Sequence, residues 1–186
     1  MRDIWLISDT HFGHANILTF RHGKGEDAPL IRGNIWSSVE EMDETLIENW
    51  NKVVKPGDKI YHLGDVFFGS KDTFIKNFKR LNGQKRLVLG NHDDAKFMAK
   101  HELFAKIDVW RMFPEFGMLL THVPVHESIL YEGRFRNFPD TPLNVHGHLH
   151  QNDSPSDKHF GVSVERINYT PIHIEEIRDA HKNRKV

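Results

Sequence analysis

Short apolar runs alternate along the chain with longer segments in which apolar residues recur every three or four positions. The short runs have the length of β-strands, and none is long enough for a helix. They occupy residues 4–7, 59–63, 86–89, 118–120, 143–145 and 161–164. Strands that alternate with helical segments predict an α/β domain built in layers.

Four segments have helical periodicity. The clearest covers residues 38–54, where Ser38 and Glu41 have the spacing of a capping box and Pro56 follows as a stop signal. The other three lie at residues 74–81, near Asp93 and near His173.

Two stretches, residues 13–37 and 123–141, follow neither pattern. We interpret both as long surface loops, a kind of segment that often carries function. The chain shows no internal repeat and no linker, so we expect a single domain over residues 1–186.

Composition narrows the chemistry. The absence of Cys excludes thiolate metal sites and a Cys nucleophile, which leaves nitrogen and oxygen atoms as metal ligands. The 25 Lys and Arg nearly balance the 26 Asp and Glu, so no bulk positive field favours duplex nucleic acid. No apolar run approaches the ~18 residues of a membrane span, and no signal-peptide segment opens the chain. We therefore expect a cytosolic protein without membrane association.

Polar motifs follow five of the predicted strands. They read Asp9-Thr10-His11, Gly64-Asp65, Gly90-Asn91-His92-Asp93, Thr121-His122 and His146-Gly147-His148-Leu149-His150. Ligands bind at the ends of strands in open α/β sheets, and Asp, Asn and His are groups that divalent cations take. The motifs therefore predict a metal site.

The spacing within the motifs indicates more than one metal ion. Residues two apart in an extended strand point the same way, so Asp9 with His11, and His148 with His150, can each offer a pair of groups to one site. A carboxylate such as that of Asp65 can bridge two cations ~3.5–4 Å apart, a separation that suits in-line attack at phosphorus.

The order of the five motifs resembles that of the calcineurin-like metallophosphoesterases, from Asp9 to His150 and over about three quarters of the chain. Within that family the chain is most similar to the small single-domain bacterial and phage phosphoesterases. The resemblance implies an α/β fold of two packed mixed β-sheets flanked by helices, a four-layer αββα sandwich. It also implies a metal-dependent enzyme that hydrolyses phosphate esters.

The same resemblance implies a set of metal ligands and a catalytic residue. One ion is held by Asp9, His11 and His150, the other by Asn91, His122 and His148, and Asp65 bridges the two. The ions would be two divalent metals, Mn²⁺ first, with Fe, Zn and Ni as alternatives. A hydroxide that bridges them attacks phosphorus, and His92 protonates the leaving oxygen, which an imidazole of ordinary pKa ~6.5 can do near neutral pH.

One departure from the family pattern narrows the range of expected substrates. Phosphoprotein phosphatases extend the Gly-Asp motif with an Asp and with an Arg that touches the phosphate, whereas residues 66–69 read Val-Phe-Phe-Gly here. We therefore expect a small phosphodiester or a nucleotide-like substrate. A phosphomonoesterase at the same site and a non-catalytic metal-binding scaffold on the same fold are the alternatives.

Four residues of the two long loops are candidate substrate contacts. His14 and Asn16 follow the first motif closely, while Arg134 and Arg136 carry guanidinium groups that suit a second phosphate. An ordinary helix start is the alternative for the first pair, and a solvated loop is the alternative for the second.

Overall fold

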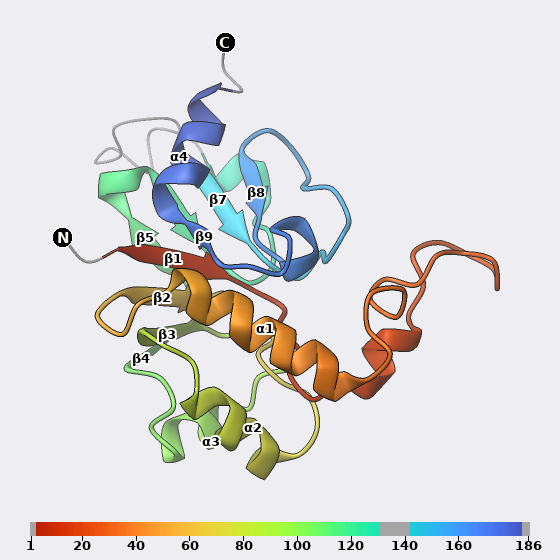
Figure 1. The fold of residues 1–186 in the computed structure, drawn as a ribbon. Coiled ribbons are helices and arrows are strands. Elements are labelled where there is room, and N and C mark those ends of the chain that lie inside the picture. The colour runs from red at the N-terminus through yellow and green to blue at the C-terminus, as the bar shows by residue number, and fades with distance from the viewer. Residues whose placement is uncertain (1–2, 131–141, 184–186) are drawn as a thin grey trace.

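Two β-sheets form the framework of the structure, a computed structural model that describes residues 3–130 and 142–183 (Figure 1). The five-stranded sheet has the order β4 (Lys106–Asp108), β3 (Gln84–Val88), β2 (Lys59–His62), β1 (Ile4–Ile7) and β9 (Ile172–His173). The four-stranded sheet has the order β5 (Arg111–Phe113), β6 (Met118–Leu120), β7 (Leu143–His146) and β8 (His159–Gly161).

Both sheets are mixed. In the five-stranded sheet β1 to β4 run parallel and β9 is antiparallel to β1; in the other, β6 to β8 run parallel and β5 is antiparallel to β6. In the first sheet Ile7 pairs with His62 and His62 with Leu87, so β1, β2 and β3 all end at one edge. In the second, Leu120 pairs with Val145 close to the ends of β6 and β7.

Four α-helices flank the sheets. They are α1 (Val39–Val53), α2 (Lys71–Lys79), α3 (Ala95–Lys100) and α4 (Ile174–Asn183). In Figure 1 the first three lie on one side of the five-stranded sheet and α4 lies on its other side, toward β7. Short 3₁₀ helices complete the described elements: η1 (Ala15–Thr19), η2 (Pro114–Phe116), η3 (Glu127–Ile129) and η4 (Val164–Arg166). The expected fold of two mixed sheets flanked by helices is confirmed.

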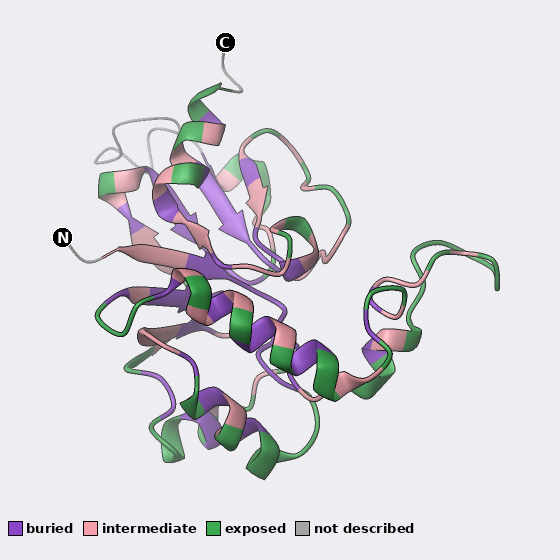
Figure 2. Ribbon diagram, viewed as in Figure 1, coloured by how far each residue is buried: buried purple, intermediate pink, exposed green. Residues whose placement is uncertain are grey.

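The core has two main parts, and alternate residues of the same strands feed them. Ile7 and Ile60 belong to the cluster shared with α1, α2 and α3, whereas their neighbours Leu6 and Tyr61 belong to the cluster between the two sheets, which also includes Ile177 of α4. This alternation follows from the two-residue period of a strand. Figure 2 shows the buried positions along the strands and on one side of α1.

The start of α1 is capped, although only half of the predicted capping box forms. The hydroxyl of Ser38 accepts a hydrogen bond from the Glu41 N–H at 3.1 Å. The Glu41 carboxylate reaches Ser37 instead, and accepts from its N–H at 3.0 Å and from its hydroxyl at 2.8 Å. The helix start at residue 39 is nevertheless as predicted.

Several predicted elements differ from the structure by one or two residues at an end, and two differ by more. The strand expected at 161–164 is wrong, because β8 covers His159–Gly161 and Val164 begins η4. The Val164 N–H bonds to the Ser8 carbonyl at 3.1 Å, so the chain has by then turned from β7 toward the end of β1. The helix expected at 74–81 ends at Lys79, because Arg80 turns back to Asn77.

Candidate metal centre

The polar motifs follow strands that end together. Asp9, Asp65 and Asn91 come after β1, β2 and β3 of the five-stranded sheet, and His122 and His148 come after β6 and β7 of the other. Because each set of strands is parallel, the motifs gather at one end of the sandwich.

The backbone at this end is not extended. Five of the motif residues other than glycine have a positive φ, namely Asp9 (57°), His11 (48°), Asp65 (57°), His148 (69°) and His150 (50°). Residues with a side chain rarely adopt this left-handed conformation, and it is retained where the surrounding structure imposes it. The argument from strand alternation is therefore wrong for His148 and His150, whose side chains are turned into two different groups.

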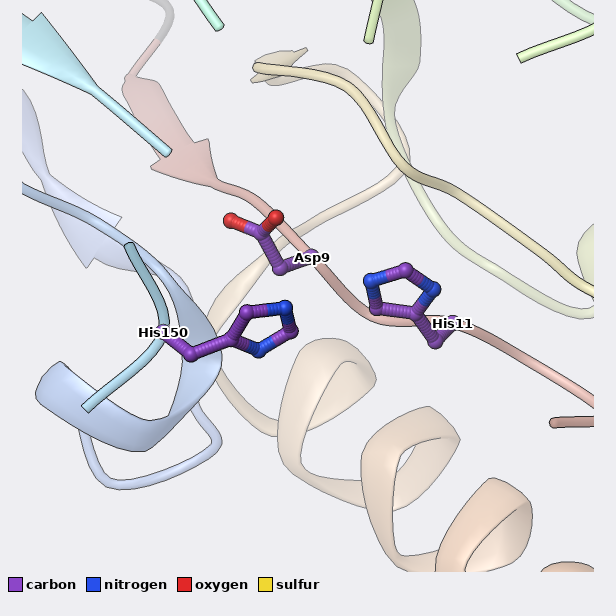
Figure 3. Close-up of side chains that lie close together, drawn as sticks. All are labelled: Asp9, His11 and His150. Carbon is purple, nitrogen blue, oxygen red and sulfur yellow. The ribbon is translucent and has the colours of Figure 1, made fainter. Parts of the chain in front are cut away.

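The first group consists of Asp9, His11 and His150, and Figure 3 shows that the three side chains lie close together. One possible ligand atom of each lies within 4.8 Å of the others. Asp9 and His11 are buried, and both ring nitrogens of His11 lack a hydrogen-bond partner. A buried imidazole without partners is costly unless something binds it, and a cation would do so.

The second group consists of Asp65, His122 and His148, with the same 4.8 Å limit on the distances between ligand atoms. Asn91 belongs beside it, because its Oδ1 lies 2.8 Å from His122 Nε2. His122 Nδ1 lies 2.7 Å from the Leu63 carbonyl, which can only accept, so Nδ1 donates there and Nε2 is the ring nitrogen that faces Asn91 and Asp65.

The carboxylate of Asp65 lies between the two groups. Its Oδ2 is 3.4 Å from His122 Nε2 and 3.8 Å from His11 Nε2. Its Oδ1 accepts a hydrogen bond from the His92 N–H at 3.0 Å, which fixes the plane of the carboxylate. Asp65 thus faces a ring nitrogen of His11 in the first group and a ring nitrogen of His122 in the second.

The electrostatics of the pocket suit cation binding. Burial lowers the pKa of His11 to about 2, so its ring is neutral. Burial alone would raise the pKa of Asp65, but its hydrogen bond and charge interaction with His122 dominate and hold this pKa well below its usual range. Burial raises the pKa of Asp9, which is the opposite of what a nearby cation would do. Imidazole nitrogens beside carboxylate and amide oxygens form a donor set for a borderline divalent metal.

Two residues that the sequence did not single out support the first group. Arg32 is 0% exposed, and its Nη2 lies 2.7 Å from Oε1 of Glu165. The same oxygen lies 3.0 Å from His150 Nδ1, so His150 donates there and keeps Nε2 available for a metal. Arg32 also donates to the backbone carbonyls of Asp9 at 2.6 Å and Thr10 at 2.9 Å.

Asp93 ties two ligand loops together. Its carboxylate accepts hydrogen bonds from the N–H groups of Asp65 (3.0 Å), Val66 (3.0 Å) and Gly90 (2.8 Å). The helix expected near Asp93 begins at Ala95, and Asp94 is its cap. Asp93 therefore holds the Asp65 and Asn91 loops in register.

The remaining predicted residues lie at different places. His92 is exposed, and its ring centroid is 5.9 Å from that of His11. His14 is half-buried, with ring centroids 5.5 Å from His11 and 4.5 Å from Phe68, so it borders the site. Asn16 is exposed on η1. Arg134 and Arg136 lie outside the described residues.

A fold of two mixed sheets with Asp and His groups gathered at the strand ends defines the metallophosphoesterase class. Residues 2–168 match the family model of the calcineurin-like phosphoesterase superfamily domain, and the chain belongs to this superfamily. The resemblance inferred from the five motifs is thereby confirmed.

Relatives match along nearly the whole chain. An uncharacterised protein of Methanocaldococcus jannaschii is 35% identical over 95% of this chain and 90% of its own length. The gene 66 protein of Mycobacterium phage L5 is 30% identical over 81% of this chain and 78% of its own. The crystal structure of a protein of unknown function from Aquifex aeolicus superposes with a TM-score of 0.66 and 29% identity, covering 97% of this chain and 100% of that one. Within residues 3–130 and 142–183, no helix is long and apolar enough to cross a membrane.

The close approach of the His148 loop to Asp9 depends on Gly147. A Cβ there would overlap the Ser8 hydroxyl and lie 2.6 Å from Asp9 Oδ2. We expect Gly147→Ala to lower the free energy of unfolding by about 1–3 kcal/mol and to weaken metal binding, because the first group must open to accommodate the methyl group. Gly57→Ala is the control, since nothing lies within 4 Å of its added Cβ. Denaturant unfolding measures the free energy of unfolding of both variants. Equal stabilities of Gly147→Ala and Gly57→Ala would contradict the prediction.

Acid should weaken the fold through Glu165. Burial alone would raise the pKa of this carboxyl, but Arg32 and the hydrogen bond with His150 outweigh burial and lower it from 4.5 to about 2. A folded-state pKa below the unfolded value stabilises the fold above pH 4.5, and this contribution is lost as the pH falls toward 2. We expect the free energy of unfolding of Glu165→Gln to be lower than that of wild type by a few kcal/mol at pH 7. The difference should become progressively smaller below pH 4.5.

Glu44→Gln is the matched control for this experiment, because Glu44 forms an ion pair with Arg80 on the surface, where the two side chains are 51% and 46% exposed. Such pairs contribute about 0–1 kcal/mol. Urea unfolding of chelator-treated protein between pH 2.5 and 7 gives the stabilities. A pH-independent difference between wild type and Glu165→Gln would show that the ionised carboxylate is not what stabilises the fold.

Proposed function

We propose that this protein is a dinuclear metal-dependent phosphoesterase that hydrolyses P–O bonds. The observation that carries the proposal is the position of Asp65, whose Oδ2 lies 3.4 Å from His122 Nε2 and 3.8 Å from His11 Nε2. A carboxylate in that position can bind a cation on each side. Family membership supports the chemistry, and the two His and Asp groups support the number of ions.

The proposed ligands keep the division that the family resemblance implies. Asp9, His11 and His150 would hold one ion, Asn91, His122 and His148 would hold the other, and Asp65 would bind both. Two divalent cations, Mn²⁺ first, would supply hydroxide from water near neutral pH and neutralise charge on the phosphate oxygens. The residues of the chain orient the ligands: Glu165 and the Leu63 carbonyl hold Nδ1 of His150 and of His122, so that each ring would bind a cation through Nε2.

His92 is the proposed general acid. Its exposed side chain extends from the loop after β3, while its backbone N–H donates to Asp65 Oδ1 at 3.0 Å. The loop is thus anchored to the bridging carboxylate, and the ring is left to face a substrate. From there His92 would give its proton to the leaving oxygen, an effect typically worth ~10²–10⁴ in rate.

Phosphodiesters are the proposed substrate class. Residues 66–69 contain no carboxylate and no guanidinium group, so they offer no Arg to bind a doubly charged monoester. Phe68 lies beside His92 instead, with ring centroids 5.6 Å apart. His14 and Asn16, together with Arg134 and Arg136, are proposed substrate contacts. The expected cytosolic location stays a prediction.

Metal reconstitution tests the function. Chelator-stripped protein should gain hydrolysis of bis(4-nitrophenyl) phosphate when Mn²⁺ is added, and should turn over 4-nitrophenyl phosphate more slowly. Asp65→Asn should lose nearly all of this activity, because an amide oxygen is a weaker bridge between two cations. Protein that binds two equivalents of metal and hydrolyses neither ester would favour the non-catalytic scaffold.

The role of His92 depends on the leaving group. We expect His92→Ala to bind two equivalents of Mn²⁺ by calorimetry, as wild type does, and to lose about 10²–10⁴ in rate on alkyl leaving groups. The loss should be much smaller for nitrophenolate, which departs without a proton. His101→Ala, an exposed His at the end of α3, is the control. An equal loss for both leaving groups would refute the general-acid assignment.

A further inference from the structure

A cavity of about 740 Å³ shares a wall with the candidate metal centre. Asn91 and His122 form that wall. Most of the remaining lining is apolar and includes Val109, Trp110, Met112, Leu119, Val123 and Ile129. We refer to it as the apolar cavity. Its volume lies within the ~300–1,000 Å³ of small-molecule sites.

The described lining offers little to a polar ligand. It contains no Asp, Glu, Lys or Arg side chain. Thr121 already donates to the Val123 carbonyl at 2.7 Å and accepts from Asn144 at 2.9 Å. A sugar or nucleobase would lose hydrogen bonds to water on entering and would find few in return, whereas a hydrocarbon would lose none.

Exposed hydrophobic side chains gather around the same end of the molecule. Six large ones are exposed in the described residues, and Val109 (71%), Trp110 (56%) and Val123 (49%) line the apolar cavity. Phe20 and Phe68 contact the ring of His14, which itself borders His11. Their ring centroids lie 5.6 and 4.5 Å from that of His14. Such a concentration of apolar surface marks a ligand site.

Phe68 lies on one side of the candidate metal centre and the apolar cavity lies on the other. We use these two positions to assign a place to each substituent of a diester. His92 contacts Phe68 but does not line the apolar cavity, so the leaving group that His92 protonates lies toward Phe68. The substituent that stays on phosphorus is left to the side of Asn91 and His122.

We propose that the apolar cavity binds the substituent retained on phosphorus, and that this substituent is a hydrocarbon chain or ring. The inference rests on the proposed phosphodiesterase function and narrows its substrate class from phosphodiesters in general to those with a hydrophobic retained substituent. Hydrolysis adds water across the P–O bond, releases the leaving alcohol and gives the monoester of the retained hydrocarbon, which is the product held in the cavity.

A series of alkyl 4-nitrophenyl phosphodiesters tests the inference in the Mn²⁺-loaded protein. The leaving group stays constant while the retained group grows from methyl to butyl. Each buried methylene is worth a factor of about four in affinity, so we expect kcat/KM to rise at least about tenfold across the series even with partial burial. Thymidine 5′-(4-nitrophenyl) phosphate should be a poorer substrate than the butyl ester.

Two variants place the effect in the cavity. Val109→Asp and Trp110→Ser change exposed side chains and should reduce the butyl-to-methyl ratio of kcat/KM by roughly threefold or more, since each removes apolar contact. Ile35→Ser is the control, because Ile35 is 48% exposed and does not line the cavity. An unchanged ratio in both cavity variants would overturn the inference.

Equilibrium binding separates this inference from the proposed function. Calorimetry with butyl phosphate and methyl phosphate measures how tightly the cavity binds each alkyl group, without a leaving nitrophenolate. Butyl phosphate should bind at least about tenfold more tightly. Hydrolysis of every ester with no preference for butyl would overturn the cavity inference and leave the phosphoesterase intact. Butyl-selective binding that Val109→Asp abolishes, without hydrolysis of any ester, would support the cavity and refute the proposed reaction. Light scattering that shows a dimer dissociated by Val109→Asp would assign the cavity to a second copy of the chain, and would overturn the inference.

Discussion

The buried ion pair between Arg32 and Glu165 is the constraint on which the candidate centre depends. Arg32 is 0% exposed, and a guanidinium withdrawn from water is tolerated only when its donors are satisfied. Its partners are the Glu165 carboxylate and the carbonyls of Asp9 and Thr10. One side chain thus connects a long loop, the turn after β1 and η4.

Through Glu165 the same pair reaches the second sheet. Glu165 Oε1 accepts from His150 Nδ1 at 3.0 Å, so the ring that faces Asp9 and His11 is oriented by a carboxylate whose own position Arg32 fixes. Carboxylates behind metal-binding histidines commonly fix the tautomer and the angle of the ring. The left-handed backbone at Asp9, His11 and His150 is unfavourable in isolation, and these contacts hold it in place.

The sequence was sufficient for features that repeat or lie close together along the chain. The strands at residues 4–7 and 118–120 and the helix after Ser38 follow from local periodicity and capping. The motifs after parallel strands predicted that Asp and His side chains gather at one end of the sheets, whereas their division into two groups was implied only by the family resemblance. The edge strands β4, β5 and β9 have only two or three residues each and include polar ones, so none forms an apolar run and none was predicted.

Contacts between distant residues left no local signal. Arg32 and Glu165 are 133 positions apart, and Arg32 stands among the polar residues of a segment interpreted as a surface loop. Nothing in its neighbours distinguishes it from a solvated Arg. Asp93 is similar: its three N–H donors come from two loops that only the β2–β3 pairing brings together.

Metal binding and folding are coupled by the same residues. His11 has two buried ring nitrogens without partners, and burial raises the pKa of the Asp9 carboxyl, so both groups lose favourable hydration when the protein folds. A cation between them would give the His11 ring a partner and would add to the hydrogen bonds that Asp9 accepts from Ser163 and from the His148 N–H. Binding energy released there adds directly to the stability of the fold, because the unfolded chain has no such arrangement. The rigid contacts of Arg32, Glu165 and Asp93 therefore hold in advance a set of groups that are unfavourable alone and favourable together once a cation is bound.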